Sequence, residues 1–188
     1  MKDGSLDSEI ANPKRSAWAA YHGIAEALSG IGMTRKNQLL KQSVVAAAIY
    51  GAETWNTKVK DVEIIQRTIN HIWVQAGAGD PPDMTNLIMK TKIRWAGHVA
   101  RMSPTRYCKI ITLSDFPDKY PRRKGRPKKR WVDDIKEAAK VHNHNQNLLG
   151  LGGDRRRRRI GIISSKIPWS RMAQDRSQWS CLVHSYDQ

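Results

Sequence analysis

The sequence predicts a mainly α-helical protein whose helical segments are joined by basic and polar linkers. Apolar residues recur at spacings of three and four along most of the chain, which is the period of a helix with one buried face. Alternating apolar and polar runs, the pattern of strands, are hard to find; residues 160–163 come nearest and are too few. Glycine and proline gather between the periodic segments, where they favour turns.

Residues 1–102 are expected to form four consecutive helices. The first begins at Asn12 and Pro13, an N-cap followed by a first-turn proline, and the second follows Thr34. A break over residues 76–82, with two glycines and two prolines, separates the third helix from the fourth. The apolar positions expected to face a core are Trp18, Tyr21, Ala25 and Leu28 in the first helix, Leu39, Leu40, Val44 and Ala47 in the second, Val62, Ile65, Ile69 and Ile72 in the third, and Ile88, Trp95, Val99 and Met102 in the fourth.

The composition of the sequence changes after the fourth helix. Residues 103–130 hold four prolines and many basic residues, and are predicted to be a Pro/Gly linker. A short helix is expected over residues 131–140. Residues 141–167 are polar and Gly-rich, with an unbroken arginine row at 155–159, and are predicted to be a disordered insertion. Residues 168–188 are expected to form an amphipathic C-terminal helix.

Positive charge is the strongest global property. The formal net charge is +16 and the isoelectric point about 10.2. Such an excess is self-repelling unless an anion is close, and nucleic acid is the commonest anionic partner. A membrane surface is the rival, but no apolar run approaches the roughly 18 residues of a spanning helix. The expected partner is therefore RNA, DNA or a hybrid, contacted through its backbone, with no membrane and no small-molecule substrate.

The two cysteines, Cys108 and Cys181, form no CxxC pair. Neither a disulfide framework nor a zinc ribbon is expected, so the chain is predicted to be intracellular, in the nucleus or the cytoplasm, without a metal or another cofactor.

A basic run before Trp131 is the main candidate for nucleic-acid binding. It brings eight positive charges with no acid among them, and Gly125 and Pro127 keep the chain extended, so it can follow a phosphate backbone. The alternative is a solvated tail or a patch of the nuclear-localisation type. The residues are Lys119, Arg122, Arg123, Lys124, Arg126, Lys128, Lys129 and Arg130.

A second candidate lies on the fourth helix, where His98 stands between Arg94 and Arg101. On a helix this histidine can face a phosphate together with the two arginines. The alternative is a ring that packs and hydrogen-bonds locally.

Two patterns imitate catalytic motifs and are rejected. Trp131-Val132-Asp133-Asp134 matches the aromatic-x-Asp-Asp box of a polymerase, but it follows a basic linker and continues as a helix, where first-turn aspartates suit the macrodipole. The His142–Asn145 tract lacks the ββα setting of an HNH nuclease and shows no third metal ligand. No catalytic residue is expected in this chain.

Five stretches follow one another along the chain: DSEIANPKRSAWAAY at 7–21, IYGAETW at 49–55, RWAGHVARM at 94–102, GRPKKRWVDDI at 125–135 and WSRMAQDRSQW at 169–179. In this order they resemble the C-terminal region of the endonuclease–reverse transcriptases of non-LTR (LINE-type) retrotransposons. Each stretch alone is a weak signal, whereas five in the expected order span almost the whole chain. The interval between Trp55 and Arg94 is shorter than in that family, and residues 141–168 look like an insertion.

The resemblance implies a thumb-like, post-palm helical segment over residues 1–102, whose role is to grip a template–primer duplex. Lys14 and Arg15 are then plausible duplex contacts, or else solvated residues. The polymerase aspartates and the endonuclease are expected to be absent, which leaves sequence-tolerant nucleic-acid binding. The alternatives are a poorly folded pseudogene product without function and a basic adaptor that binds a protein through the helix at 169–186.

Overall fold

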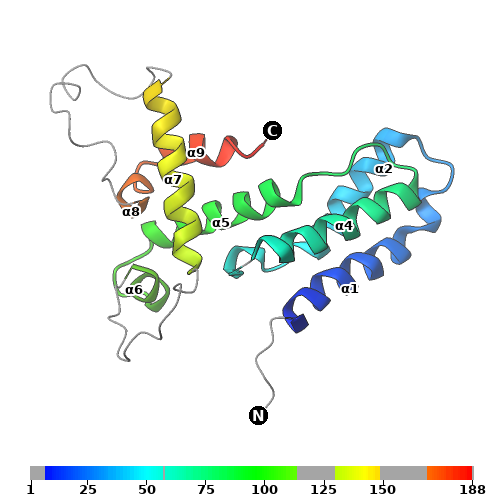
Figure 1. Cartoon of the computed structure of the whole chain (residues 1–188), viewed down its shortest axis with the longest axis horizontal. Coiled ribbons are helices and arrows are strands. Elements are labelled where there is room, and N and C mark those ends of the chain that lie inside the picture. Colours follow the sequence, from blue (N-terminus) through cyan, green and yellow to red (C-terminus); the bar gives the residue numbers. More distant parts are fainter. Residues whose placement is uncertain (1–6, 57, 114–129, 149–168, 188) are drawn as a thin grey trace, which may run out of the picture. The chain divides into compact units, whose positions relative to one another are not determined.

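The computed structural model describes residues 7–56, 58–113, 130–148 and 169–187 (Figure 1). Within these ranges every regular element is a helix, so the prediction of a mainly α-helical protein is confirmed. None of the helices in the described part is both long enough and apolar enough to cross a membrane.

The chain divides into two compact units, Met1–Ile88 and Met89–Gln188, called here the N-terminal unit and the C-terminal unit. Each has its own hydrophobic core. The division falls inside helix α5 (Met84–Arg101), whereas the sequence predicts a boundary after residue 102. The physical reason is that Ile93, Ala96 and Ala100 of α5 are buried with residues that come much later in the chain.

The N-terminal unit is built from α1 (Asp7–Ile24), a 3-10 turn η1 (Glu26–Leu28), α2 (Met33–Leu40), a π-helical stretch η2 (Lys41–Val45), α3 (Ala46–Ala48), a second 3-10 turn η3 (Ala52–Thr54), α4 (Val59–Ala76) and the start of α5. Most of the predicted stripe positions on the first three helices supply its core: Tyr21, Leu40, Val44, Ile65, Ile69 and Ile72 are all buried. The prediction for Leu39 was wrong, since its side chain is exposed.

Helix α1 begins earlier than the sequence predicted. Pro13 lies inside α1 and not at its start, because the helix already runs from Asp7. A proline in a helix interior cannot donate the usual backbone hydrogen bond. The ring of Pro13 is buried, and this packing offsets part of that loss.

Polar side chains hold α4 in place within the N-terminal unit. The indole of Trp73 donates to Asn37 Oδ1 (2.7 Å), and Lys36 Nζ donates to the carbonyl of Ala76 (3.0 Å) at the end of α4. Gly77 ends the helix in the left-handed conformation, with φ +60°. The break predicted over residues 76–82 is therefore confirmed as the end of α4.

The C-terminal unit contains the rest of α5, α6 (Tyr107–Leu113), α7 (Trp131–Leu148), α8 (Trp169–Met172) and α9 (Arg176–His184). Helices α6 to α9 differ from the expected segments. Helix α6 forms inside the predicted 103–130 linker, and α7 runs eight residues beyond 140 into the predicted insertion. Residues 149–167 and 114–129 lie outside the described residues.

The expected C-terminal helix is split in two. Residues 173–175 separate α8 from α9 because Asp175 caps the N-terminus of α9: its carboxylate accepts from the backbone N–H groups of Ser177 (3.0 Å) and Gln178 (3.2 Å). A capping residue has non-helical backbone, so the chain turns at this point.

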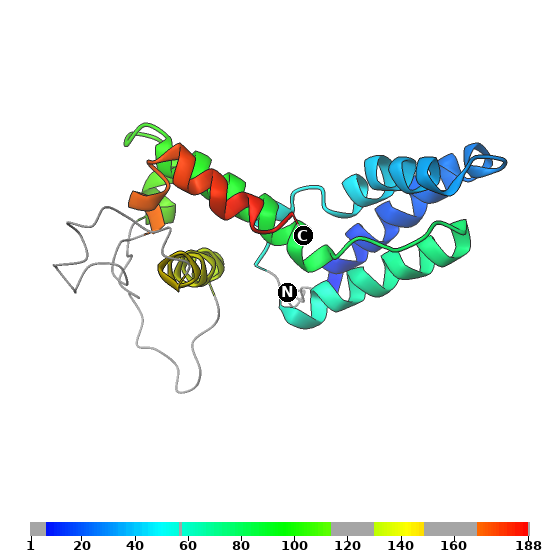
Figure 2. The same ribbon diagram turned by 90° about the horizontal axis from the view of Figure 1, so that it is seen from above.

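The core of the C-terminal unit depends on a glycine. The indole of Trp179, on α9, lies so close to Gly97 of α5 that a Cβ there would come within 2.1 Å of its Nε1. The same Nε1 donates to the carbonyl of Ile93 (2.9 Å). Figure 2 shows α9 running beside α5, as these contacts require. Trp169, Met172, Leu182 and Val183 complete the apolar face that α8 and α9 bury.

A buried ion pair connects α5 with α7. Lys92 Nζ lies 2.7 Å from Asp134 Oδ2, and the two side chains are 0% and 6% exposed. Asp134 therefore has a role that the sequence did not indicate: its charge faces an ammonium in the core, in addition to lying in the first turn of a helix.

Candidate nucleic-acid interface

Helix α5 has one face that its neighbours leave uncovered. Lys92, Ile93, Ala96, Gly97, Val99 and Ala100 are buried and form one arc of the helix, which α7 contacts at Lys92 and α9 contacts at Ile93. Arg94 and His98 are exposed, and Trp95 and Arg101 are half-buried. Because residues three, four and seven apart share a helix face, Arg94, His98 and Arg101 form one continuous strip with Trp95 at its edge. We call these four residues the α5 strip.

The two arginines of the strip differ in their surroundings. Arg94 makes no hydrogen bond or ion pair with any described residue, so its guanidinium is available to a ligand. Arg101 Nη1 donates to the carbonyl of Ala173 (2.7 Å), while Gln174 Nε2 donates to the carbonyl of Ala100 (2.8 Å). Arg101 and Gln174 thus join the end of α5 to the segment between α8 and α9, and Arg101 has a structural role.

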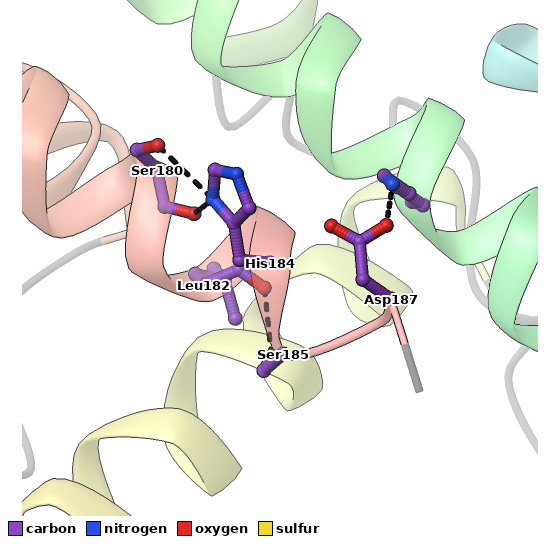
Figure 3. A network of polar contacts seen from close by, with 6 residues as sticks. Ser180, Leu182, His184, Ser185 and Asp187 are labelled. Atoms are coloured by element: carbon purple, nitrogen blue, oxygen red, sulfur yellow. Dashed lines mark hydrogen bonds and ion pairs between the residues drawn. The ribbon is translucent and has the colours of Figure 1, made fainter.

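The far end of α9 reaches the start of the C-terminal part of α5. Asp187 forms an ion pair with Lys90, and Figure 3 shows the carboxylate directed at this ammonium. The remaining polar contacts there are local to α9: His184 Nδ1 lies 2.7 Å from the carbonyl of Ser180, and Ser185 Oγ donates to Leu182. Lys90 is therefore paired within the unit and is not counted in the strip.

Positive charges are brought close together along this surface. Burial and the nearby guanidinium of Arg94 lower the pKa of Lys90. Burial and the charge of Arg176, at the start of α9, lower the pKa of Arg101. Cations held at short range raise the local potential, and an anion bound there would relieve that repulsion.

Of the predicted basic run, Arg130 alone is described. It is exposed, its N–H donates to Asp133 Oδ2 (2.8 Å) and it directly precedes α7. Asp133 thus serves the helix start, as expected for the Trp131–Asp134 stretch. Trp131 packs partly buried against the core of the C-terminal unit. Lys119, Arg122, Arg123, Lys124, Arg126, Lys128 and Lys129 lie outside the described residues.

One of the predicted core tryptophans is not in a core. Trp73 and Trp179 are buried, and Trp18 and Trp55 pack against the core of the N-terminal unit. Trp95 belongs to neither described core; its ring lies against His98, with centroids 5.4 Å apart. The prediction for Trp95 was wrong because its helical position falls between the buried arc and the exposed strip.

Other predicted residues have simple environments. Lys14 and Arg15 are exposed on α1. His142 lies on α7, where burial lowers its pKa. Within the described ranges no three His, Cys, Asp or Glu side chains gather as metal ligands. Neither the position of Arg176 at the start of α9 nor the half-exposed position of Trp95 was predicted from the sequence. Asp175, a common N-cap residue, was the available signal that a helix begins at Arg176.

Comparison with known proteins gives one informative similarity. An uncharacterized transposon-derived protein of Caenorhabditis elegans is 24% identical over an alignment of 199 residues, which covers 95% of this chain. The chain spans 65% of that protein's length. No protein-family model matches the sequence, and no solved structure matches it. The similarity, which extends over nearly the whole chain, supports a transposon origin.

Proposed function

We propose that this chain derives from the C-terminal region of a LINE-type endonuclease–reverse transcriptase and that its own activity is sequence-tolerant nucleic-acid binding without polymerisation. The binding surface in this proposal is the α5 strip together with the basic run that precedes α7. Phosphate contacts by arginine carry such binding, and they do not depend on base sequence.

The observation that carries the proposal is the meeting of three motif stretches in one core. The stretch at 94–102 provides Gly97, the stretch at 125–135 provides Asp134, and the stretch at 169–179 provides Trp179. Gly97 receives the indole of Trp179, and Asp134 pairs with Lys92, just before the first stretch. Motifs that are far apart in sequence but depend on one another for packing are what an inherited folding unit requires. This mutual dependence supports the proposal.

The same packing favours a folded unit over a decayed product. In the C-terminal unit the apolar side chains of α8 and α9 are buried, and an ion pair and reciprocal carbonyl contacts join the helices. No buried side-chain nitrogen or oxygen of the described residues lacks a hydrogen-bond partner. A sequence drifting without selection would be expected to leave such groups unpaired.

The test is binding across a salt series. Fluorescence anisotropy with a labelled RNA–DNA hybrid should give an affinity that falls steeply with salt, and Arg94→Gln should reduce the slope of log K against log salt by about 1. Lys140→Gln, an exposed change on α7, is the matched control. An absence of binding at low salt, or an affinity insensitive to salt, would contradict the proposal.

A protein-binding adaptor is a second candidate. In the segment at 169–186, Trp169, Trp179 and Val183 are buried within the C-terminal unit. Helix α6 instead exposes apolar side chains: Tyr107 is 81% and Ile111 64% exposed. An Ile111→Lys variant that keeps nucleic-acid affinity but loses a protein partner would favour this candidate.

A further inference from the structure

The edge of the α5 strip carries an aromatic ring that is half-buried and belongs to neither described core. The neighbour of Trp95 on the helix face is the ring of His98, tilted by 34°. The exposed part of the indole leaves apolar surface in contact with water. The cost is offset if the ring has a ligand.

The indole nitrogen of Trp95 supports the same conclusion. The indole N–H groups of Trp73 and Trp179 donate to Asn37 and to the carbonyl of Ile93. That of Trp95 donates to no described atom, yet no described buried side-chain nitrogen is left without a partner. The Nε1 edge of Trp95 therefore lies at the solvent-accessible surface.

Two arginines lie on the strip to one side of this ring. Arg94 precedes Trp95 and is without a partner among the described residues, and Arg101 lies about 10 Å further along the helix axis. Arg101 uses Nη1 on Ala173, and a guanidinium has five N–H donors, so others remain for a phosphate. An aromatic ring beside two cations matches the chemistry of a nucleotide chain, with a base for the ring and phosphates for the arginines.

We infer that the α5 strip binds single-stranded nucleic acid, with an unpaired base stacked on Trp95 and the flanking phosphates held by Arg94 and Arg101. This inference rests on the proposed nucleic-acid binding and specifies its substrate class. Base faces are covered by neighbouring pairs in a duplex, whereas an unpaired base offers its face to an aromatic side chain. His98 positions the indole by packing against it.

Two probes test the inference: a fluorescein-labelled oligothymidylate of about 12 nucleotides and a duplex of the same length. Trp95→Leu should weaken binding of the single strand by roughly 5- to 150-fold and change the duplex affinity by less than about twofold. Trp95→Phe, which keeps an aromatic face, should restore most of the loss. Lys136→Gln, exposed on α7, is the control for an unrelated surface charge. Circular dichroism establishes that each variant melts as the wild type does.

A second readout uses the wild-type chain alone. A single 2-aminopurine is moved along the oligonucleotide, and its fluorescence should be quenched on binding at the position that stacks. Quenching at no position, or a Trp95→Leu variant that weakens single strand and duplex equally, would overturn the stacking inference and leave the proposed function standing. A wild-type chain that binds neither probe at low salt would overturn the proposed function itself.

Discussion

The ammonium of Lys92 and the carboxylate of Asp134 form a 2.7 Å ion pair that is almost completely removed from solvent between α5 and α7. Burial makes each charge costly without the other, so the pair specifies how these two helices pack. The pair fixes which face of α5 packs against α7, and so it also fixes which face of α5 is left to solvent. The orientation of Arg94 and Trp95 therefore depends on the Lys92–Asp134 pair, although neither residue contacts it.

Removing one member of the pair should destabilise the C-terminal unit strongly. Lys92→Met leaves a buried carboxylate without its ammonium, and the expected loss in the free energy of unfolding is about 3–5 kcal/mol. The double variant Lys92→Met/Asp134→Leu should recover most of this loss. Urea unfolding followed by circular dichroism measures both. Lys140→Met, which removes an exposed pair with Glu137, should cost less than about 0.5 kcal/mol. A double variant as unstable as the sum of its singles would show that the charges are not coupled.

Gly97→Ala should destabilise the chain because the added methyl group meets the indole of Trp179. The expected cost is about 1–3 kcal/mol, as for other overpacked cores. Gly23→Ala in α1 is the contrasting change: no atom lies within 4 Å of its Cβ, so replacing a helical glycine should stabilise by roughly 0.5–1 kcal/mol. Thermal and urea unfolding compare the two. Equal effects of the two substitutions would rule out the close contact at Gly97.

Acid should weaken the start of α9. Hydrogen bonds from the Ser177 hydroxyl and then the Gln178 N–H lower the pKa of Asp175. Since the pKa in the folded chain is below that in the unfolded chain, the stabilisation is present above the unfolded-state pKa and is lost as the pH falls through the folded-state pKa. Asp175→Asn keeps a capping oxygen but cannot titrate. The difference in melting temperature between wild type and Asp175→Asn should shrink from neutral pH to about pH 3, and a constant difference would contradict this account.

Substitutions of Arg101 and Arg94 should differ in their effect on stability, although both should weaken binding. Arg101→Gln removes the donor to Ala173 and should lower the free energy of unfolding by about 1–2 kcal/mol. Arg94→Gln should change stability by no more than about 0.5 kcal/mol, because its side chain has no described partner. Both should weaken binding of an oligonucleotide in anisotropy measurements. If Arg101→Gln left the melting temperature unchanged, its contact with Ala173 would have no structural weight.

Helical periodicity predicted the stripes of the N-terminal core well. Ile65, Ile69 and Ile72 are buried as expected, because a run of four turns with one apolar face has few alternatives. Periodicity was less informative where a helix has several neighbours. Lys92 is fully buried, and a sequence pattern assigns a lysine to the surface unless its buried partner, 42 residues away, is known.

Local chemistry could have improved the prediction at the C-terminal end. Asp175 followed by Ser177 and Gln178 is a helix start. The apolar residues before and after this stretch suit one continuous helix, and they made the start hard to recognise from periodicity. The position of Trp95 was harder to predict, since Ile88 and Val99 on the same expected stripe are buried. Only the packing of α7 and α9 determines where the covered face of α5 ends. The seven positions of the basic run from Lys119 to Lys129 lie outside the described residues, and their role stays a prediction.

The fit of Trp179 over Gly97 also constrains how such a sequence can change over generations. A copy of the element that lost this tryptophan would leave a hollow that any small side chain at 97 could enter, and the glycine would no longer be under selection. In a copy that first acquired a larger residue at position 97, the new side chain would displace the indole of Trp179 from its place against α5. Substitutions at the two positions should therefore accumulate together. The presence of both Gly97 and Trp179 can serve as a marker of a C-terminal unit that selection still maintains in its folded form.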